Sequence, residues 1–380
     1  MKKSNSAALG IIFPNTYDAL VPELTGQRLM ASVPFASRYR LIDFMLSSMS
    51  NSGVDNISIM VNKNYHSLID HLGSGREWDL VRKNGGLHIF PPYVTGTSKP
   101  YTGRVGALAG ILDFLRETTE DYIIIADANI ACNFDFADMI AAHKASGADV
   151  TMAYNVQALP ESILNSTDNS RGFYYTMDVA DGKVTNIYVN ERTPGDHNFC
   201  MNIYVINRLT LIDQINTAYV RGLEYFERDI LLPQLNVLKV MAYEFKGYVA
   251  RISSLKSYFD ENMKLLNDAN LDGLFAGAPI YTKIRDDNPT RYIAGAKVSN
   301  TMAADGCVIE GEVENCVLFR GVHIGKGAKV KNCILMQDTV VEADSELEYI
   351  VADKDCVISA GTRMNGTDSF PVYIAKYSKI

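Results

Sequence analysis

Histidine and cysteine side chains are the first candidates for metal binding or catalysis in this sequence. His66 and His71 lie five residues apart, so they would share a helical face poorly, and no third ligand stands near them. The six cysteines show neither a CxxC pair nor a zinc-type spacing; they are Cys132, Cys200, Cys307, Cys316, Cys333 and Cys356. We therefore predict no metal site here and interpret the cysteines as reduced, buried, small hydrophobic residues.

The elements that must position any site alternate between short apolar strands and helices through the larger, N-terminal part of the chain. We expect strands at residues 7–13, 57–61, 122–126 and 149–154, and helices at 40–50, 67–72, 106–117 and 136–146. This alternation favours an α/β fold with a mostly parallel sheet and helices on both faces. Because ligands of such sheets bind beyond the carboxyl ends of the strands, chemistry is expected in the loops after Phe13 and Ala126.

The overall composition excludes several classes of protein. The chain has 47% hydrophobic and 21% charged residues, which argues against extensive disorder. Its net charge of −8 and its lack of dense Lys/Arg clusters argue against nucleic acid as a partner. No apolar run approaches the ~18 residues that span a bilayer, and the apolar stretch 7–13 ends at Pro14 without a cleavage site. We therefore expect a cytoplasmic protein with no membrane partner.

The C-terminal part contains an internal repeat. Asn315–Phe319 recurs 17 residues later as Asn332–Met336. The same spacing relates two further sets of positions, which are Cys307, Ile324, Val341 and Ile358, and Val313, Val330, Leu347 and Met364. A six-residue apolar period grouped into coils of this length is typical of a parallel β-helix built from hexapeptides, in which stacked coils bury one another's apolar side.

A segment rich in Asp, Gly, Asn and Ala separates the two parts, as a connection between domains would. We predict an N-terminal domain at residues 1–270, a linker at 271–292 and the β-helix at 293–380.

The segment Ser32–Phe44 reads SVPFASRYRLIDF and is followed by Asn51-Ser52-Gly53. This pattern resembles the bacterial glucose-1-phosphate adenylyltransferases, also called ADP-glucose pyrophosphorylases. Further matches are Gly103, Ala107, Glu191-Arg192, Ile203-Tyr204 and Gly247-Tyr248. The resemblance covers essentially the whole chain and implies a Rossmann-like nucleotidyltransferase domain, a left-handed β-helix and a tetramer. The reaction it implies joins ATP and glucose 1-phosphate, with Mg²⁺, into ADP-glucose and pyrophosphate for glycogen synthesis.

The positions that hold the triphosphate and Mg²⁺ in this family carry unsuitable residues here. The glycine-rich phosphate loop falls on Asn15–Leu20, which contains no glycine and has Leu20 in place of an arginine. Met30 stands where the family has a lysine, and the two metal-binding aspartates align with Asn129 and Arg251. An amide is a poor Mg²⁺ ligand beside a carboxylate, and an arginine repels the cation. We therefore predict that no catalytic residue, no metal site and no cofactor is retained.

One group of candidate ligand contacts matches the family's sugar-phosphate motifs. Arg192 replaces a lysine and keeps a positive charge that grips phosphate, next to Glu191. Asn202 stands where the family has a glycine, which weakens this interpretation. The alternative is that Arg192 is a surface partner of Glu191.

A second group consists of Arg28, Arg38 and Arg40, which flank the Ser32–Phe44 block. The resemblance implies that anionic effectors bind in this region, near the junction of the domains. The alternative is that these arginines are solvated or paired with Asp43.

The resemblance and the altered positions together predict a non-catalytic regulatory subunit. It would pair with a catalytic homologue in a hetero-tetramer and form homo-oligomers when alone. One alternative is an active sugar-nucleotide transferase that recruits Asp127 or Asp135 as a metal ligand. Another is a hexapeptide-repeat acyltransferase, with His323 as its catalytic histidine, or a purely structural partner. Trp78, the single tryptophan, is either a subunit or lid contact or a core residue.

Overall fold

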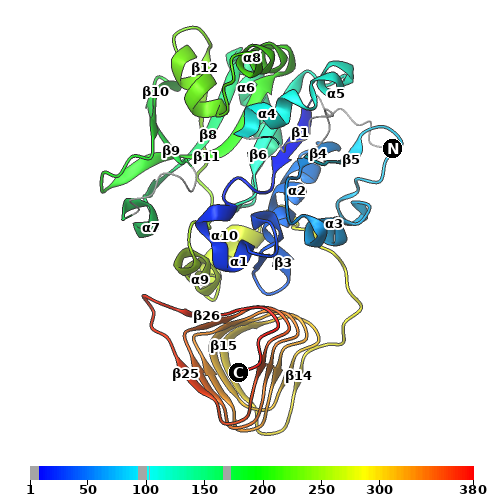
Figure 1. Cartoon of the computed structure of the whole chain (residues 1–380), viewed down its shortest axis with the longest axis vertical. Helices are drawn as coiled ribbons and strands as arrows, with labels where there is room; N and C mark the ends of the chain where they lie inside the picture. The colour runs from blue at the N-terminus through cyan, green and yellow to red at the C-terminus, as the bar shows by residue number, and fades with distance from the viewer. Residues whose placement is uncertain (1–7, 93–100, 102, 166–172) are drawn as a thin grey trace.

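The computed structural model describes residues 8–92, 101, 103–165 and 173–380, which form two bodies (Figure 1). The larger is an α/β domain, and the smaller is a triangular stack of short strands at the C-terminal end of the chain. The predicted fold class, an α/β domain followed by a parallel β-helix, is confirmed.

Among the described residues, a nine-stranded sheet forms the centre of the α/β domain. In sheet order the strands are β5 (Gly86–Phe90), β4 (Asn56–Met60), β1 (Ala8–Phe13), β6 (Tyr122–Asp127), β11 (Asp196–Asn207), β8 (Val150–Ala158), β12 (Val240–Glu244), β10 (Lys183–Val189) and β9 (Tyr175–Ala180). The half from β5 to β6 is parallel, as expected, whereas β11 runs antiparallel between β6 and β8 and makes the other half mixed. Ala7, in the predicted first strand, lies outside the described residues.

Helices cover both faces of this sheet, because successive strand residues point to opposite sides. Ile12 of β1 belongs to one apolar core, and its neighbour Ile11 belongs to the other. The first core lies under α2 (Leu41–Asn51), α3 (His66–Leu72) and α6 (Phe136–Ser146), and the second lies under α4 (Gly103–Ala109), α5 (Leu112–Glu117) and α8 (Arg208–Val220). The single helix predicted at 106–117 is two helices, α4 and α5, since Gly110 lies between them and glycine disfavours a continuous helix.

Short elements complete the α/β domain at the edge nearest the β-helix. They are α1 (Pro22–Thr25), β2 (Pro34–Phe35), β3 (Tyr39–Arg40), β7 (Ile130–Ala131), α7 (Glu161–Leu164), β13 (Ala250–Arg251), α9 (Leu255–Lys264) and α10 (Asp268–Phe275). β7 and β13 pair antiparallel, with Arg251 opposite Ile130. This pairing brings two segments that are distant in the sequence to the carboxyl end of β6.

The C-terminal body is a parallel β-helix. Its strands are β14 (Arg291–Tyr292), β15 (Lys297–Ala303), β16 (Val308–Ile309), β17 (Glu312–Leu318), β18 (His323–Ile324), β19 (Lys329–Lys331), β20 (Ile334–Leu335), β21 (Val340–Val341), β22 (Glu346–Glu348), β23 (Ile350–Ala352), β24 (Val357–Ile358), β25 (Arg363–Asn365) and β26 (Val372–Ile374). Ile324 stacks on Val341 and Val341 on Ile358, which confirms the repeat. Its predicted first member, Cys307, is wrong, because Ile324 pairs with Ile309, only 15 residues earlier.

An apolar cluster, which we call the junction cluster, joins the two bodies. Val33 and Phe35 lie in one buried group with Val317 and Ile334 of the β-helix. The hydroxyl of Tyr258 on α9 donates to the Pro34 carbonyl over 2.8 Å, which fixes the same segment from the other side. The Val33–Phe35 part of the characteristic Ser32–Phe44 block therefore serves to hold the domains together.

The predicted domain boundary at residue 270 falls inside α10, which continues to Phe275 because Leu274 is buried in the junction cluster. The residues from 276 to 290 form the extended connection to β14.

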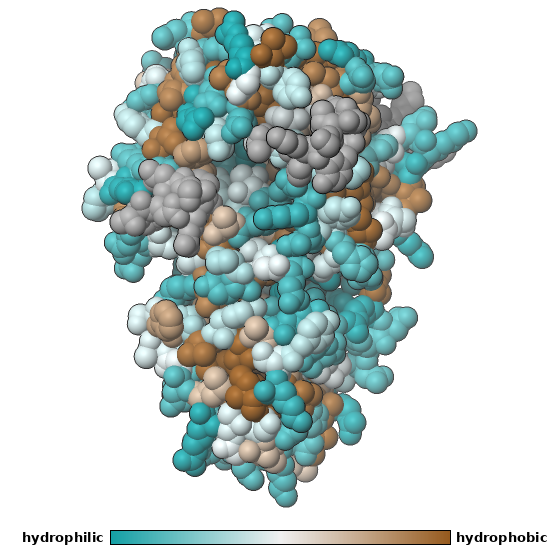
Figure 2. Space-filling view, in the orientation of Figure 1, coloured by the Kyte–Doolittle hydropathy of each residue, from teal (hydrophilic) through white to brown (hydrophobic). Residues whose placement is uncertain are grey.

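Hydrophilic side chains predominate around the junction on the face shown in Figure 2. Within the described part of the chain, no helix has the length and apolar character to cross a membrane.

All six cysteines are buried and free, as predicted. Trp78 is also fully buried in the first core, which supports its interpretation as a core residue.

Candidate functional site

The carboxyl ends of β1 and β6 lie side by side, with Phe13 paired to Asp127. This is the edge of the sheet where a ligand is expected, and we call it the ligand edge. A buried ion network occupies it. Arg104, at the start of α4, donates to the Asp127 carboxylate over 2.5 Å and also to Glu227. Thr16, in the loop after β1, donates to the other Asp127 oxygen over 2.9 Å. Burial opposes the charge of Arg104, but Asp127 outweighs it and raises the pKa of the guanidinium, so Arg104 stays charged.

Tyrosine and asparagine side chains extend this network. Tyr204 donates to Glu227 over 2.8 Å, and Tyr17 donates to the Phe173 carbonyl over 2.8 Å. Asn202 donates to the Tyr17 hydroxyl from a left-handed backbone conformation with φ of 53°. Asparagine tolerates that conformation, so it can replace glycine there, and its side chain then fills the space that glycine leaves open. Burial raises the pKa of Tyr17, which remains a neutral hydroxyl.

Asn129 and Arg251, which the resemblance aligns with two metal-binding aspartates, lie close together in the structure. The Asn129 carbonyl accepts the backbone N–H of Ile252 over 2.9 Å, which places Asn129 beside Arg251. The Arg251 guanidinium is buried, lies 3.8 Å from the centre of the Phe199 ring and donates to Asn155 over 3.2 Å. Burial lowers the pKa of Arg251, because in the described residues no carboxylate is paired with it.

Met30 and Leu20, which stand where the family has a lysine and an arginine, also pack against other side chains. Met30 is buried in the junction cluster, and its backbone N–H donates to Asp18 over 2.7 Å. Leu20 is half-buried against the same cluster. Asp18 is held mainly by this bond, and burial raises its pKa to about 7. Leu20, Met30 and Asp18 therefore offer no cation to a phosphate.

The residues present do not fit Mg²⁺. A divalent cation needs several oxygen ligands, but Asp127 already faces Arg104, and Arg251 brings a positive charge to the second position. Asp135 caps α6 by accepting the N–H groups of Ala137 and Asp138. Among the described residues no group of three or more His, Cys, Asp or Glu side chains is arranged to hold a metal ion.

The candidate sugar-phosphate residues have different surroundings. Glu191 accepts hydrogen bonds from Thr176 and Thr193, at 2.5 and 2.7 Å, and lies 3.4 Å from His197. Arg192 is exposed, whereas Asn202 is buried under the loop after β1. The structure therefore places Asn202 in the network around Asp127 and leaves Glu191 and Arg192 in the connection before β11.

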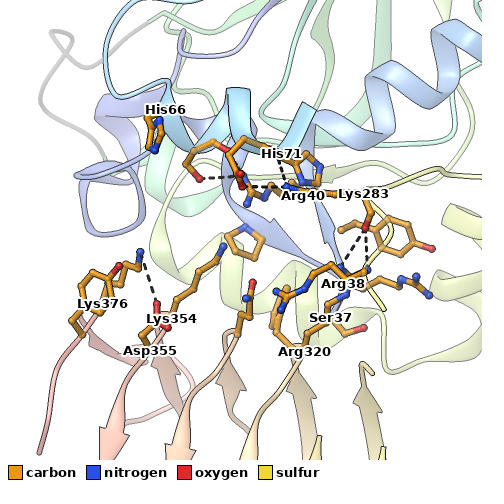
Figure 3. Close-up of a pocket in the computed structure, with 18 residues that line it drawn as sticks. Ser37, Arg38, Arg40, His66, His71, Lys283, Arg320, Lys354, Asp355 and Lys376 are labelled. Carbon is orange, nitrogen blue, oxygen red and sulfur yellow. Dashed lines mark hydrogen bonds and ion pairs between the residues drawn. The ribbon is translucent and has the colours of Figure 1, made fainter. Parts of the chain in front are cut away.

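A cavity of about 530 Å³ lies between the two bodies (Figure 3). We call it the junction cavity. Seven basic side chains and two carboxylates line it, against a net charge of −8 for the chain; they are Arg38, Arg40, Lys283, Arg285, Arg320, Lys354 and Lys376, with Asp70 and Asp355. Such a local excess of positive charge favours anions. Two of the three predicted effector arginines, Arg38 and Arg40, line this cavity.

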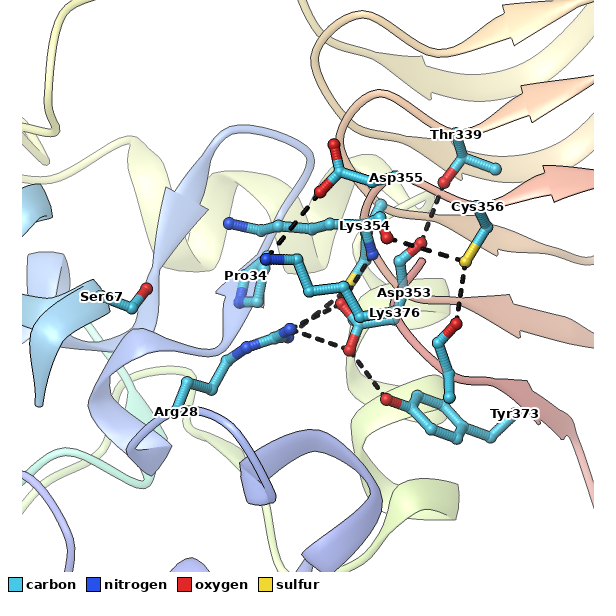
Figure 4. A network of polar contacts seen from close by, with 12 residues as sticks. Arg28, Pro34, Ser67, Thr339, Asp353, Lys354, Asp355, Cys356, Tyr373 and Lys376 are labelled. Atoms are coloured by element: carbon cyan, nitrogen blue, oxygen red, sulfur yellow. Dashed lines mark hydrogen bonds and ion pairs between the residues drawn. The ribbon is translucent and has the colours of Figure 1, made fainter. Parts of the chain in front are cut away.

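The third, Arg28, is not among the residues that line the cavity. Its guanidinium is buried and makes a bidentate pair with Asp353 of the β-helix, at 2.7 and 2.8 Å (Figure 4). Tyr373 also donates to Asp353 over 2.7 Å. Arg28 is thus a structural link between the bodies. Asp43, the suggested partner of the arginines, instead pairs with His71 at 2.6 Å and accepts the backbone N–H of Arg40.

Sequence reasoning missed several residues of these sites. Arg104 and Glu227 carry no motif that links them to Asp127, since only the fold brings α4, β6 and the short helix Phe226–Leu231 together. Lys354 had a detectable signal, because it follows Arg320 and Gln337 at the 17-residue interval of the β-helix. Equivalent positions of stacked coils face the same side.

Known families match both bodies. The nucleotidyl transferase family matches residues 20–162, and the GlmU-like C-terminal hexapeptide family matches residues 284–369. The chain thus combines a nucleotidyltransferase domain with a left-handed β-helix of hexapeptide repeats, which is the class of protein that the fold and the ligand edge define.

Full-length relatives identify the family more closely. The chain is 36% identical over 373 residues to glycogen biosynthesis protein GlgD of Bacillus subtilis (strain 168), covering 98% of this chain and 96% of that protein. It is 36% identical over 332 residues to glycogen biosynthesis protein GlgD of Geobacillus stearothermophilus, covering 86% and 83%. It is 31% identical over 316 residues to the glucose-1-phosphate adenylyltransferase of the latter organism, covering 81% and 79%. The chain belongs to the family that contains GlgD and the glucose-1-phosphate adenylyltransferases.

Proposed function

We propose that this chain is a non-catalytic regulatory subunit in glycogen synthesis. It pairs in the cytoplasm with a catalytic glucose-1-phosphate adenylyltransferase, which makes ADP-glucose and pyrophosphate from ATP and glucose 1-phosphate. The observation that carries the proposal is the buried network of Arg104, Asp127 and Glu227 at the ligand edge. The Arg104 guanidinium balances the charge of the carboxylates, so they need neither a nucleotide nor a metal ion to be stable in the buried edge.

The intact framework supports a role in assembly. The apolar junction cluster and the Arg28–Asp353 pair hold the two bodies together although the chemistry at the ligand edge is lost. A chain of this shape can take a subunit position in a hetero-tetramer, since homologous chains form pseudo-symmetric contacts like those of homo-oligomers.

Co-expression with the catalytic homologue of the same organism tests this proposal. We expect a mixed oligomer by native mass measurement and a changed kcat, KM or effector response relative to the catalytic chain alone. The isolated chain, purified from a host without adenylyltransferase, should form no ADP-glucose. Failure to form a mixed oligomer, or unchanged kinetics within one, would refute the regulatory role. ADP-glucose formation by the isolated chain would refute its non-catalytic character.

We further propose that the junction cavity binds an anionic effector, with Arg38 and Arg40 among its contacts. Arg38 has no carboxylate partner among the described residues and lies over the Tyr39 ring at 5.9 Å, so its charge is available to a ligand. Replacement of Arg38 by Met should weaken sulfate binding to the purified chain. A matched Arg363→Met variant, which removes an exposed β-helix arginine outside the cavity, should bind sulfate normally.

A further inference from the structure

One basic side chain of the junction cavity differs from the others in its surroundings. Lys354 points into the cavity from a turn of the β-helix (Figure 3). Its neighbour Asp353 is already engaged by Arg28 and Tyr373, and Asp355 lies 3.9 Å from Lys376 (Figure 4). In the part of the chain that the structure describes, no carboxylate is therefore left to pair with the Lys354 ammonium.

Charged and titratable groups from every packed element face Lys354 or the cavity around it. They are Arg28, Arg38, Tyr39 and Arg40 from the α/β domain, His66, Asp70 and His71 from α3, Lys283 and Arg285 from the connection, and Arg320, Asp353, Asp355, Tyr373, Lys376 and Tyr377 from the β-helix. Burial, together with the positive charges of Arg40 and Arg28, lowers the pKa of Lys354 to about 7. An ordinary lysine titrates near 10.4. Lys354 is thus close to half-protonated at neutral pH while the cavity holds no anion.

Resting on the proposed effector site, we infer that Lys354 is the proton-linked contact of the junction cavity: an anion that binds there takes up one proton on this side chain. A negative charge within a few ångströms favours the ammonium and restores the ordinary charged state. Anion binding and proton binding then reinforce each other by linkage. The regulatory consequence is an effector affinity that falls as the pH rises through neutrality.

The expected size of the effect follows from the fraction of Lys354 that is protonated before the anion arrives. With a pKa of about 7 in the free protein, that fraction falls from about 0.9 at pH 6 to about 0.03 at pH 8.5. Sulfate affinity should therefore fall about thirtyfold over this interval. At pH 8, binding should take up about 0.9 proton.

Titration calorimetry with sulfate on the full chain tests this inference, because sulfate keeps its charge over this pH range, whereas inorganic phosphate titrates within it. Measurement in two buffers of different ionisation enthalpy yields the proton uptake directly. Lys354→Arg keeps a permanent charge, so we expect no proton uptake, a flat pH profile and about tenfold tighter binding than the unmodified chain at pH 8. Lys354→Met should bind weakly at every pH, also without uptake.

Two control variants separate Lys354 from its neighbours. His66→Gln removes an exposed imidazole of the same cavity and should leave the proton uptake unchanged. Lys376→Met removes another cation and should weaken binding without abolishing the uptake. Trp78 fluorescence verifies that each variant is folded.

The outcomes distinguish the inference from the proposed site. Sulfate binding with proton uptake that disappears in Lys354→Arg supports both. Sulfate binding without uptake, or with uptake that persists in Lys354→Arg, overturns the role of Lys354 and leaves the anion site standing. Absence of sulfate binding at pH 6 overturns the anion site, and the inference with it.

Discussion

Replacement of Arg104 by Met should destabilise the α/β domain strongly. The guanidinium is buried and pairs with both Asp127 and Glu227, so its loss leaves two buried carboxylates without a cation. Breaking one buried pair by removing a single partner costs about 3–5 kcal/mol. Because a whole domain is stable by only about 5–15 kcal/mol, we expect at pH 8 a loss of that size in the free energy of unfolding. Met keeps much of the apolar volume, which limits any cavity term.

The measurement is urea unfolding followed by the fluorescence of Trp78, the single tryptophan, which is fully buried in this domain. Arg116→Met is the matched control, because it removes an exposed arginine that pairs with Asp113 on α5. Such surface pairs contribute about 0–1 kcal/mol. A triple variant, Arg104→Met with Asp127→Asn and Glu227→Gln, also removes both unpaired carboxylates. It should regain most of the lost free energy of unfolding.

The loss should also depend on pH. Without Arg104, the folded-state pKa values of the two buried carboxyls lie above their values in the unfolded chain. The penalty is then larger at pH 8 and shrinks as the pH falls towards the unfolded-state values. Arg104→Met should therefore lose less stability at pH 5 than at pH 8. A loss below about 1 kcal/mol at pH 8, or one that does not change with pH, would refute the role of Arg104 as the internal cation.

Three further changes probe the rest of the molecule. Asp353→Asn leaves the buried Arg28 guanidinium without its carboxylate and should lower the free energy of unfolding by about 3–5 kcal/mol. An unchanged midpoint of chemical unfolding would contradict the proposed link between the bodies. Asp18→Asn removes a carboxyl whose pKa burial raises to about 7; because its penalty grows between pH 4 and 7, the gain in Tm should be larger at pH 8 than at pH 4.5, and an equal gain would contradict that pKa. The double change Asn129→Asp with Arg251→Asp should yield no efficient synthesis of ADP-glucose, measured by mass spectrometry, because groups that act as a unit are not restored piecemeal; ordinary rates would overturn this view of the ligand edge.

Periodicity and the family resemblance predicted the fold because both depend on local signals. Strand alternation and the 17-residue spacing are visible in the sequence, and stacking of Val341 on Ile324 follows from them. The misplaced Cys307 shows the limit of this approach, since the shorter first coil changes the register without changing the apolar pattern. α10 spans the predicted boundary at residue 270 for a related reason, because burial of Leu274 in a distant cluster extends this helix.

The candidate site was predictable only where one motif carries it. The resemblance aligned Asn129 and Arg251 with two metal-binding aspartates, and the structure brings them together although Asn129 lies in the turn before β7 and Arg251 lies in β13. The pairing of Arg28 with Asp353 did not follow, because nothing local distinguishes Arg28 from Arg38. Which arginine faces a cavity and which is buried depends on where the β-helix docks, and that is a property of the whole fold.

The position of the junction cavity links an anionic effector to the proposed partnership. The cavity is lined by Arg38 and Arg40 on one body and by Arg320 and Lys354 on the other, so an anion within it contacts both. Such a ligand can shift the arrangement of the bodies only by the difference between its affinities for the alternative arrangements. The Arg28–Asp353 pair and the apolar cluster oppose large movements, because interiors packed in this way are not continuously deformable. In the proposed hetero-oligomer we therefore expect an effector signal to pass through small displacements of the β-helix. Weakening the junction by Asp353→Asn should alter that response even where the mixed oligomer still forms.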